Sequence, residues 1–404
     1  MRIAIVGGGA AGFFLAVAIK EIEKSHSVTI YESGSAPLRK VKVSGGGRCN
    51  ISNTFNNVKD LKDVYPRGHK LLKRLFKAFS PEDAQQWWRE HGVALTAQED
   101  ECIFPVSQSS QTVIDALTIS AKRLGVQVLY NAKVESVAAL KNEYDAVVLA
   151  TGGIHLPSAD NPLYDELLKL GHEMLLPVPS LFTFSIENEG LRELTGVVVE
   201  KVEMKVPGTK FRTSGALLIT HWGVSGPATL KLSSHAARFL ADNNYIAPLS
   251  INWLNCTPQE AEQQLYAFIL QNPKKEITTC PFAKMQNRLW RFLVSRSMDY
   301  TTTTDGSMLH YSSLSKKQIN RLIETLTNDT YSIAGRYKHK DEFVTCGGVA
   351  LSSVDKNSLE SKCLPGLYFV GEVLDIDGVT GGFNFQACWT TAMIVARAVT
   401  QAKN

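Results

Sequence analysis

Glycines near the start of the chain are spaced as in a loop that binds a phosphate-containing ligand. The apolar run Ile3–Val6 predicts a buried parallel strand, and the segment GGGAAG follows it directly. In that segment Gly7 permits a tight turn, and Gly9 leaves room for a pyrophosphate beside the backbone. Gly12 allows a helix to pack closely on the sheet, and the free N–H groups at the start of that helix would hold the anion.

An acidic residue stands at the end of the second predicted strand, Val28–Tyr31. Glu32 follows Gly12 by 20 residues, with a predicted helix at 13–20 between them. A carboxylate at this offset accepts hydrogen bonds from a ribose, and it disfavours a 2′-phosphate. Strand, glycine turn, helix and acid together indicate a dinucleotide, either FAD or NAD.

A second glycine-rich segment, KVKVSGGGRCN at 40–50, favours FAD. Three consecutive glycines are costly inside a helix or strand, so we expect the backbone to run close to a ligand here. Lys40, Lys42 and Arg48 add positive charge that suits a pyrophosphate or the O2/N1 edge of a reduced flavin. The alternative is a flexible surface loop.

Further strands are predicted where short apolar runs end in turn residues, at 126–130, 134–137, 145–150 and 366–372. The last of these ends in Glu372, and the segment GVTGGFNFQ then leads into a predicted helix at 387–399. A helix N-terminus at the N1/C2=O edge of a flavin would stabilise the reduced, anionic ring. Glu372 or Asp377 could bind the ribityl hydroxyls. The alternative is an ordinary turn before a packing helix.

These motifs carry a family resemblance. GGGAAG, SGGGRCN, LATGG, THWGVSGP, VTCGGV and GLYFVGEVLDIDGVTGGFNFQ together resemble the BaiN/aminoacetone-oxidase-type FAD-dependent flavoproteins, of the glutathione-reductase-like superfamily. The resemblance implies a Rossmann-like FAD-binding domain assembled from both chain ends. The residues expected to bind FAD are Gly7, Gly9, Ala10, Ala11, Gly12, Glu32, Ser33, Lys40, Ser44, Gly45, Gly46, Gly47, Arg48, Cys49, Asn50, Val134, Ala150, Thr151, Gly152, Gly153, Gly371, Glu372, Asp377, Gly381, Gly382, Asn384 and Phe385. One departure is residues 154–162, which lack the expected Gly/Ser/Asp-rich run and leave the substrate open.

The middle of the chain interrupts the FAD-domain pattern. Short β-rich runs with turn signals predict a small barrel or sandwich, and Thr257-Pro258-Gln259-Glu260 predicts a helix start with Thr257 as N-cap. The resemblance implies a β-barrel insert that carries a helical cap. We expect an α/β fold with the FAD-binding domain at 1–173 and 341–404, the barrel at 174–256 and 329–340, and the helical insert at 257–328.

The loop His221–Pro227 is the candidate roof over the flavin, because ligand sites concentrate at domain junctions. His221 is the candidate general base or substrate anchor, since imidazole titrates near neutral pH. The alternative is a histidine that only hydrogen-bonds backbone in its loop.

The composition excludes several classes of protein. Of 404 residues 44% are hydrophobic and 20% charged, typical of a globular chain, and glycines interrupt the apolar run 3–19, which argues against a signal peptide. A net charge of +4 is too small to argue for a nucleic-acid partner, so neither a nucleic-acid partner nor a membrane partner is expected. Seven scattered cysteines predict neither disulfides nor a metal site, and they fit a cytoplasmic protein. The oligomeric state stays open.

The chain lacks a second dinucleotide motif and a CxxxxC pair, so NAD(P)H would bind transiently and Cys49 is expected to be buried and inert. The favoured function is an FAD-dependent oxidoreductase in which a small organic substrate or NAD(P)H exchanges a hydride with flavin N5, and O2 or another acceptor reoxidises the ring. Two alternatives stay open. One is an RNA-modifying or RNA-binding flavoprotein, supported by the basic stretch 67–77, which is otherwise a solvated helix face. The other is a non-catalytic flavin-binding protein.

Overall fold

The computed structural model describes residues 1–153, 161–298, 308–337 and 344–401. The chain forms two compact units. The first joins Met1–Pro179 to Val344–Asn404, and the second is Ser180–Phe343. Most of the segment at which the sequence departs from the family pattern, residues 154–160, lies outside the described residues.

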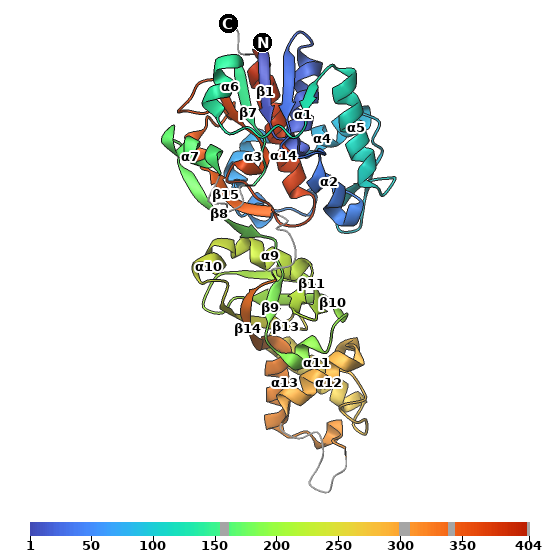
Figure 1. Cartoon of the computed structure of the whole chain (residues 1–404). Helices are drawn as coiled ribbons and strands as arrows, with labels where there is room; N and C mark the ends of the chain where they lie inside the picture. Colours follow the sequence, from blue (N-terminus) through green and yellow to red (C-terminus); the bar gives the residue numbers. More distant parts are fainter. Residues whose placement is uncertain (154–160, 299–307, 338–343, 402–404) are drawn as a thin grey trace. The chain divides into compact units, whose positions relative to one another are not determined.

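A parallel sheet forms the centre of the first unit (Figure 1). Within the described residues its strand order is β16-β7-β1-β2-β6. The central strand β1 (Arg2–Val6) pairs with β2 (Ser27–Tyr31) on one side and β7 (Ala146–Leu149) on the other. Beyond them lie β6 (Gln127–Leu129) and β16 (Leu367–Phe369). Because β16 comes from the C-terminal part of the chain, both chain ends contribute strands to one sheet. This confirms the expected assembly of a Rossmann-like domain from both chain ends.

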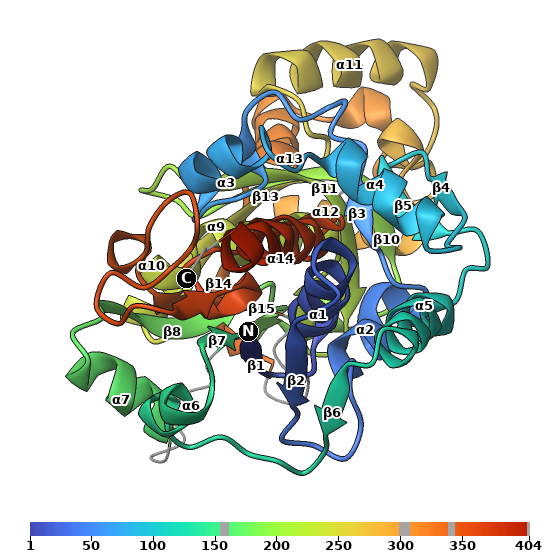
Figure 2. The ribbon, with the colours of Figure 1, turned by 90° about the horizontal axis from the view of Figure 1, so that it is seen from above.

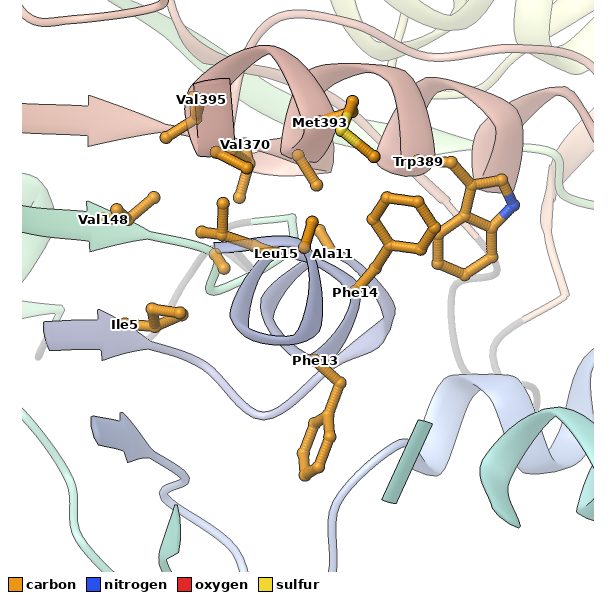
Figure 3. Packing of buried hydrophobic residues seen from close by; sticks show 14 of the residues in the cluster. Ile5, Ala11, Phe13, Phe14, Leu15, Val148, Val370, Trp389, Met393 and Val395 are labelled. Carbon is orange, nitrogen blue, oxygen red and sulfur yellow. The ribbon is translucent and has the colours of Figure 1, made fainter. Parts of the chain in front are cut away.

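Two helices from opposite ends of the chain pack against each other beside this sheet. α1 (Ala10–Ile22) and α14 (Phe383–Gln401) lie side by side in Figures 1 and 2. In Figure 3 Phe14 of α1 faces Trp389 of α14, and their ring centroids are 5.3 Å apart. Helices buried on most sides must find apolar neighbours, so this contact fixes the two chain ends to each other.

The aromatic residues near position 80 belong to the same core. Trp88 is fully buried, and Phe79 and Trp87 are nearly so. The other helices and strands of this unit are α2 (Arg39–Val43), β3 (Ser52–Asn53), α3 (His69–Leu75), α4 (Pro81–Glu90), β4 (Leu95–Ala97), β5 (Cys102–Pro105), α5 (Ser110–Arg123), α6 (Val137–Glu143), α7 (Pro162–Lys169), β8 (Met174–Ser180) and β15 (Val344–Val349).

Two predicted elements were wrong in detail. Residues 134–137 form no strand; instead Ser136 caps α6, and its hydroxyl accepts a hydrogen bond from the N–H of Ala139. The last helix starts at Phe383 rather than at 387. Gly382 is the last glycine before it, and the buried ring of Phe383 already packs in the first turn of the helix.

The second unit contains a closed barrel with strand order β10-β11-β12-β9-β14-β13. This confirms the β-barrel that the family resemblance implied. The strand near position 200 is continuous, and its register against β11 shifts between Val199 and Val202. The strands are β9 (Phe184–Ile186), β10 (Val198–Lys205), β11 (Arg212–Thr220), β12 (Gly223–Ser225), β13 (Ala247–Asn252) and β14 (Asp329–Arg336).

Helices accompany the barrel, and one of them begins as predicted. The Thr257 hydroxyl accepts from the N–H of Glu260, and the Glu260 carboxylate accepts from the N–H of Thr257, which makes a complete capping box. The helices are α8 (Glu189–Arg192), α9 (Pro227–His235), α10 (Ala237–Asp242), α11 (Pro258–Gln271), α12 (Asn287–Ser297) and α13 (Lys316–Asn328). No helix formed by the described residues of either unit is long and apolar enough to cross a membrane.

Candidate functional site

The turn after β1 uses two glycines for backbone packing. Gly7 has φ of 114°, and a side chain there would overlap the carbonyl of Ala150 at the end of β7. A side chain at Gly12 would overlap the carbonyl of Gly7. Both positions therefore keep the turn, the sheet and α1 in close contact.

Gly9 differs from these two, because space beside it is open. It is the N-cap residue of α1 with φ of −86°, and a Cβ there would meet no atom of the described residues within 4 Å. No side chain caps this helix start, and its first turn carries no acidic residue. The N–H groups at this helix start are thus available to an anion such as a pyrophosphate.

Glu32 is held in place at the end of β2. Its carboxylate accepts hydrogen bonds from the N–H of Gly8, at 2.9 Å, and of Gly34, at 2.7 Å. The side chain is partly exposed, so its oxygens can also accept from a ribose. The neighbouring Ser33 is exposed.

The second glycine segment forms a tight turn, Ser44–Gly47, directly after α2. Gly45, Gly46 and Gly47 have φ of 56°, 69° and 85°, and side chains at the last two would meet no atom within 4 Å. The Arg48 guanidinium lies 4.4 Å from the ring centroid of Phe104, and its Nε donates to the carbonyl of Gly45. This turn therefore offers open backbone beside a cation, as a flavin or pyrophosphate needs.

Cys49 is fully buried, as predicted. Burial raises the pKa of its thiol to about 12, so the thiol stays protonated at neutral pH. All seven cysteines are free thiols.

Polar contacts join the second glycine segment to the start of α14. The Asn50 amide donates to the carbonyl of Ser52 at 2.9 Å and accepts from the N–H of Gly382 at 3.1 Å. The Asn53 amide donates to the carbonyl of Gly381 at 3.1 Å, and the Ser52 hydroxyl donates to Gln386 at 2.7 Å. Residues more than 300 positions apart thus form one loop cluster.

Glu372 connects three parts of the first unit. Its carboxylate accepts from Lys40 at 3.0 Å and from the N–H of Thr345 at 2.7 Å. The Thr345 hydroxyl is buried and has no hydrogen-bond partner among the described residues, and a side chain at Gly153 would overlap it. Gly152 next to it has φ of 74°. The end of β7, the start of β15 and the residues after β16 therefore meet at this carboxylate.

Asp377 is fully buried, and Arg67 binds both of its carboxylate oxygens. This pair fixes the loop before α14 to the segment before α3. Arg67 was counted in the basic stretch 67–77, where Lys70, Lys73 and Lys77 are indeed exposed. Asn384 holds the same loop, because its amide both donates to and accepts from the backbone of Gly378 at 2.8 Å.

Most of the residues expected to bind FAD lie in these loops and helix starts. Phe385 stacks on Trp389 in α14, and Val134 is a partly buried residue between β6 and α6. Asn53, Tyr65, Thr345 and Gln386 also belong to this region, and none of them was among the residues expected to bind FAD. Only Asn53 could have been found, because ISN directly continues the SGGGRCN motif. Tyr65, Thr345 and Gln386 form hydrogen bonds with residues that are distant in sequence, which no local motif reveals.

His221 belongs to the second unit, at the tip of the β11–β12 hairpin. Its exposed ring stands at 84° to the ring of Trp222, at 4.4 Å between centroids, and Trp222 stacks on Tyr337 at 4.0 Å. An exposed imidazole on a rigid aromatic pair is free to meet a substrate. Its catalytic role stays a proposal.

The chain matches the family model described as HI0933-like protein Rossmann domain over residues 1–398. It belongs to this family. The chain is 28% identical to a ribosomal RNA dihydrouridine synthase of Escherichia coli strain K12, over 99% of this chain and 98% of that protein. It is 25% identical to a 3-dehydro-bile acid delta(4,6)-reductase of Clostridium scindens, over 99% of both chains.

Among solved structures, a 3-ketosteroid delta1-dehydrogenase from Sterolibacterium denitrificans is similar with a TM-score of 0.48 and 14% identity, over 99% of each chain. The family match confirms the resemblance drawn from the motifs. The protein is an FAD-dependent oxidoreductase, and the open backbone at Gly9, Gly46 and Gly47 fits its cofactor.

Proposed function

We propose that the protein reduces a carbon–carbon double bond conjugated with a carbonyl group, and that a uridine of ribosomal RNA is its substrate. The observation that carries the proposal is the loop cluster of the first unit, where hydrogen bonds join the second glycine segment to the start of α14 beside the open backbone of Gly46 and Gly47. FAD bound there and reduced by NAD(P)H would supply a hydride at N5.

The relatives support the reaction type. A dihydrouridine is a uridine whose ring double bond is saturated, and a delta(4,6)-reductase removes double bonds conjugated with the 3-oxo group of its bile acid. In both reactions a hydride would add to the carbon of the conjugated double bond that is farther from the carbonyl, and a proton to the other carbon of that bond. One hydride source and one proton donor would therefore suffice for either type of substrate.

The chain's own residues have separate tasks in this proposal. The N–H groups following Gly9 would bind the pyrophosphate, and Glu32 the adenosine ribose. The turn at Gly45–Gly47 and the first turn of α14, which carries no acidic side chain, would lie against the flavin ring and favour its reduced, anionic state. Asp377 positions the loop through Arg67 and does not contact the ligand. His221 is the proposed proton donor or substrate anchor.

Charge distribution favours RNA over a small organic substrate. Residues 180–343 contain 19 lysines and arginines against 15 aspartates and glutamates, whereas the rest of the chain contains 24 of each. The excess of four positive charges, small for a whole chain, is thus confined to the second unit. Positive charge concentrated on one part of a protein attracts a phosphate backbone.

The test is to incubate the FAD-loaded protein and NADPH with ribosomal RNA purified from cells that lack this gene. Mass spectrometry of the digested RNA should show one uridine that has gained a hydrogen molecule. A parallel incubation with a 3-oxo steroid that carries a conjugated double bond tests the other substrate type. Unchanged RNA beside a reduced steroid would overturn the RNA substrate, and no reduction of either would overturn the reaction type.

A further inference from the structure

A pocket of about 400 Å³ lies on the second unit, where the β10–β11 hairpin meets the end of α13 and the start of β14. This size is within the range of small-molecule sites. Its lining residues are Lys205, Val206, Pro207, Gly208, Thr209, Arg212, Asn328 and Thr330. We call it the barrel pocket. It is remote in sequence from all residues expected to bind FAD.

Strand register explains why these side chains share one face. Lys205 of β10 lies directly opposite Arg212 of β11 on one side and Ser250 of β13 on the other, and Ser250 lies opposite Thr330 of β14. Directly opposite residues point to the same face of a sheet. Met204, the neighbour of Lys205, is fully buried in the barrel core, so the row faces outward.

The polar wall of the barrel pocket is fixed. The Ser250 hydroxyl donates to the Asn328 side-chain oxygen at 2.6 Å, and the Asn328 amide donates to Glu324 at 2.7 Å. The Thr209 hydroxyl donates to the carbonyl of Val206 at 2.8 Å and accepts from the N–H of Phe211, which closes the hairpin. These bonds hold the backbone around the two cations in a single arrangement.

Lys205 and Arg212 are an unusual pair, because like charges directly opposite each other destabilise a sheet. Neither Lys205 nor Arg212 forms an ion pair with any residue in the described part of the chain, and the pocket lining contains no carboxylate. The nearest acids in sequence and register are Glu203, Glu324 and Asp329. Glu203 lies opposite Ser214 and Asn252, and Glu324 binds Asn328. Asp329, between Asn328 and Thr330, is buried and pairs with Arg296. A bound anion would turn the repulsion into attraction.

We infer that the barrel pocket binds a phosphate group through Lys205 and Arg212. A guanidinium binds phosphate oxygens in pairs, and an ammonium adds a compact charge. The Thr330 hydroxyl adds a donor at the rim. This inference rests on the proposed function, so we assign the phosphate to the backbone of the RNA substrate. The pyridine nucleotide is a second source of a phosphate group.

The test compares the FAD-loaded wild type with the double variant Lys205→Gln/Arg212→Gln. Binding of a ribosomal RNA fragment is measured by filter retention at several salt concentrations. Removing two phosphate contacts should weaken binding about tenfold at low salt, and should reduce the slope of log affinity against log salt by about 1.5. Circular dichroism melting and FAD content check that the variant is folded.

The matched control is Lys316→Gln/Lys317→Gln, which removes the same charge from exposed positions at the first turn of α13. These lysines are about 18 Å along the helix from Asn328, by helical rise. The control should bind RNA within about twofold of the wild type. An equal loss in both variants would mean diffuse attraction and would overturn the site.

A second arm measures the Kd for NADPH with the same proteins. A loss of RNA affinity with unchanged NADPH binding supports the RNA backbone as the source, and the reverse result supports a nucleotide phosphate. If neither ligand binds more weakly to the double variant, or if the wild type binds neither, the inference is wrong. Failure of uridine reduction while the double variant still loses RNA affinity would refute the proposed function and leave the pocket standing.

Discussion

At the scale of single residues, glycines that look alike in the sequence have different tasks. Gly7 and Gly12 are required by the chain itself, because side chains there would overlap backbone carbonyls. Gly9 is required by nothing in the chain, since its φ is ordinary and a Cβ would meet open space. Its absence of a side chain therefore serves the ligand.

This difference gives a prediction. Gly9→Val should lower FAD affinity at least about a hundredfold, which corresponds to about 2.7 kcal/mol, because the valine fills the pyrophosphate space. The melting temperature of the FAD-free protein should stay unchanged. Gly12→Val is the contrasting variant, and it should lower the melting temperature of the FAD-free protein. A yellow Gly9→Val protein with one FAD per chain would contradict the assignment.

His221 is the second residue-scale prediction. His221→Ala should retain FAD and lower kcat/KM about a hundredfold, as expected for the loss of a proton donor. Ser312→Ala, at another exposed position of the second unit, is the control. The pH profile separates the roles, because loss of a proton donor removes one limb of the profile, whereas loss of a substrate anchor raises KM alone. Unchanged kinetics would make His221 structural.

At the scale of elements, a buried ion pair fixes the loop before α14. Asp377 is fully buried and Arg67 is nearly so. Asp377→Asn should lower the free energy of unfolding by about 3 kcal/mol, because it leaves the guanidinium without its charge partner. The double variant Arg67→Met/Asp377→Leu should recover most of this loss. Chemical denaturation measures both, and a single variant as stable as the wild type would contradict the role.

A second contact between elements depends on pH. His91 at the end of α4 lies 2.7 Å from Glu21 near the end of α1, and its other ring nitrogen meets the carbonyl of Trp87 at 2.7 Å. Burial alone would lower the pKa of His91, but these two hydrogen bonds outweigh it and raise the pKa above its ordinary value of 6.5.

The sign of the pH effect follows from this shift. Because the folded pKa exceeds the unfolded one, the stabilisation is complete below pH 6.5 and is lost as the pH rises through the raised value. The free-energy difference between wild type and His91→Gln should therefore shrink by about 0.5 kcal/mol between about pH 6 and about pH 9. Glu21→Gln is the control, and in its background this loss should shrink, because only the hydrogen bond to Trp87 then opposes the effect of burial on the pKa of His91. A difference that grows with pH would refute the pair.

Elements defined by local patterns were predictable, whereas those defined by distant contacts were not. The strand at Ile3–Val6 and the capping box at Thr257 follow from neighbouring residues alone. The strand expected at 134–137 was wrong, because a serine cap outweighed β-branched residues there. Tyr65, Arg67 and Gln386 were missed, since their partners lie more than 300 positions away.

At the scale of the molecule, the sequence motifs predicted the assembly of one FAD-binding unit from both chain ends. Two hydrogen bonds join the chain ends in that assembly: the Asn50 side chain accepts from the N–H of Gly382, and the Asn53 side chain donates to the carbonyl of Gly381. The barrel pocket was not predictable, because a lysine and an arginine far from any motif become opposite neighbours only through the strand register.

The most direct test of the proposed reaction is anaerobic mixing of the reduced, FAD-loaded protein with a ribosomal RNA fragment in a stopped-flow spectrometer. The account predicts that the visible absorbance of oxidised flavin returns with RNA that carries the unmodified uridine, and that the same fragment with dihydrouridine at that position leaves the flavin reduced. If the flavin stays reduced with the unmodified fragment and with conjugated carbonyl compounds alike, and is reoxidised only when O2 is admitted, the proposed function is wrong.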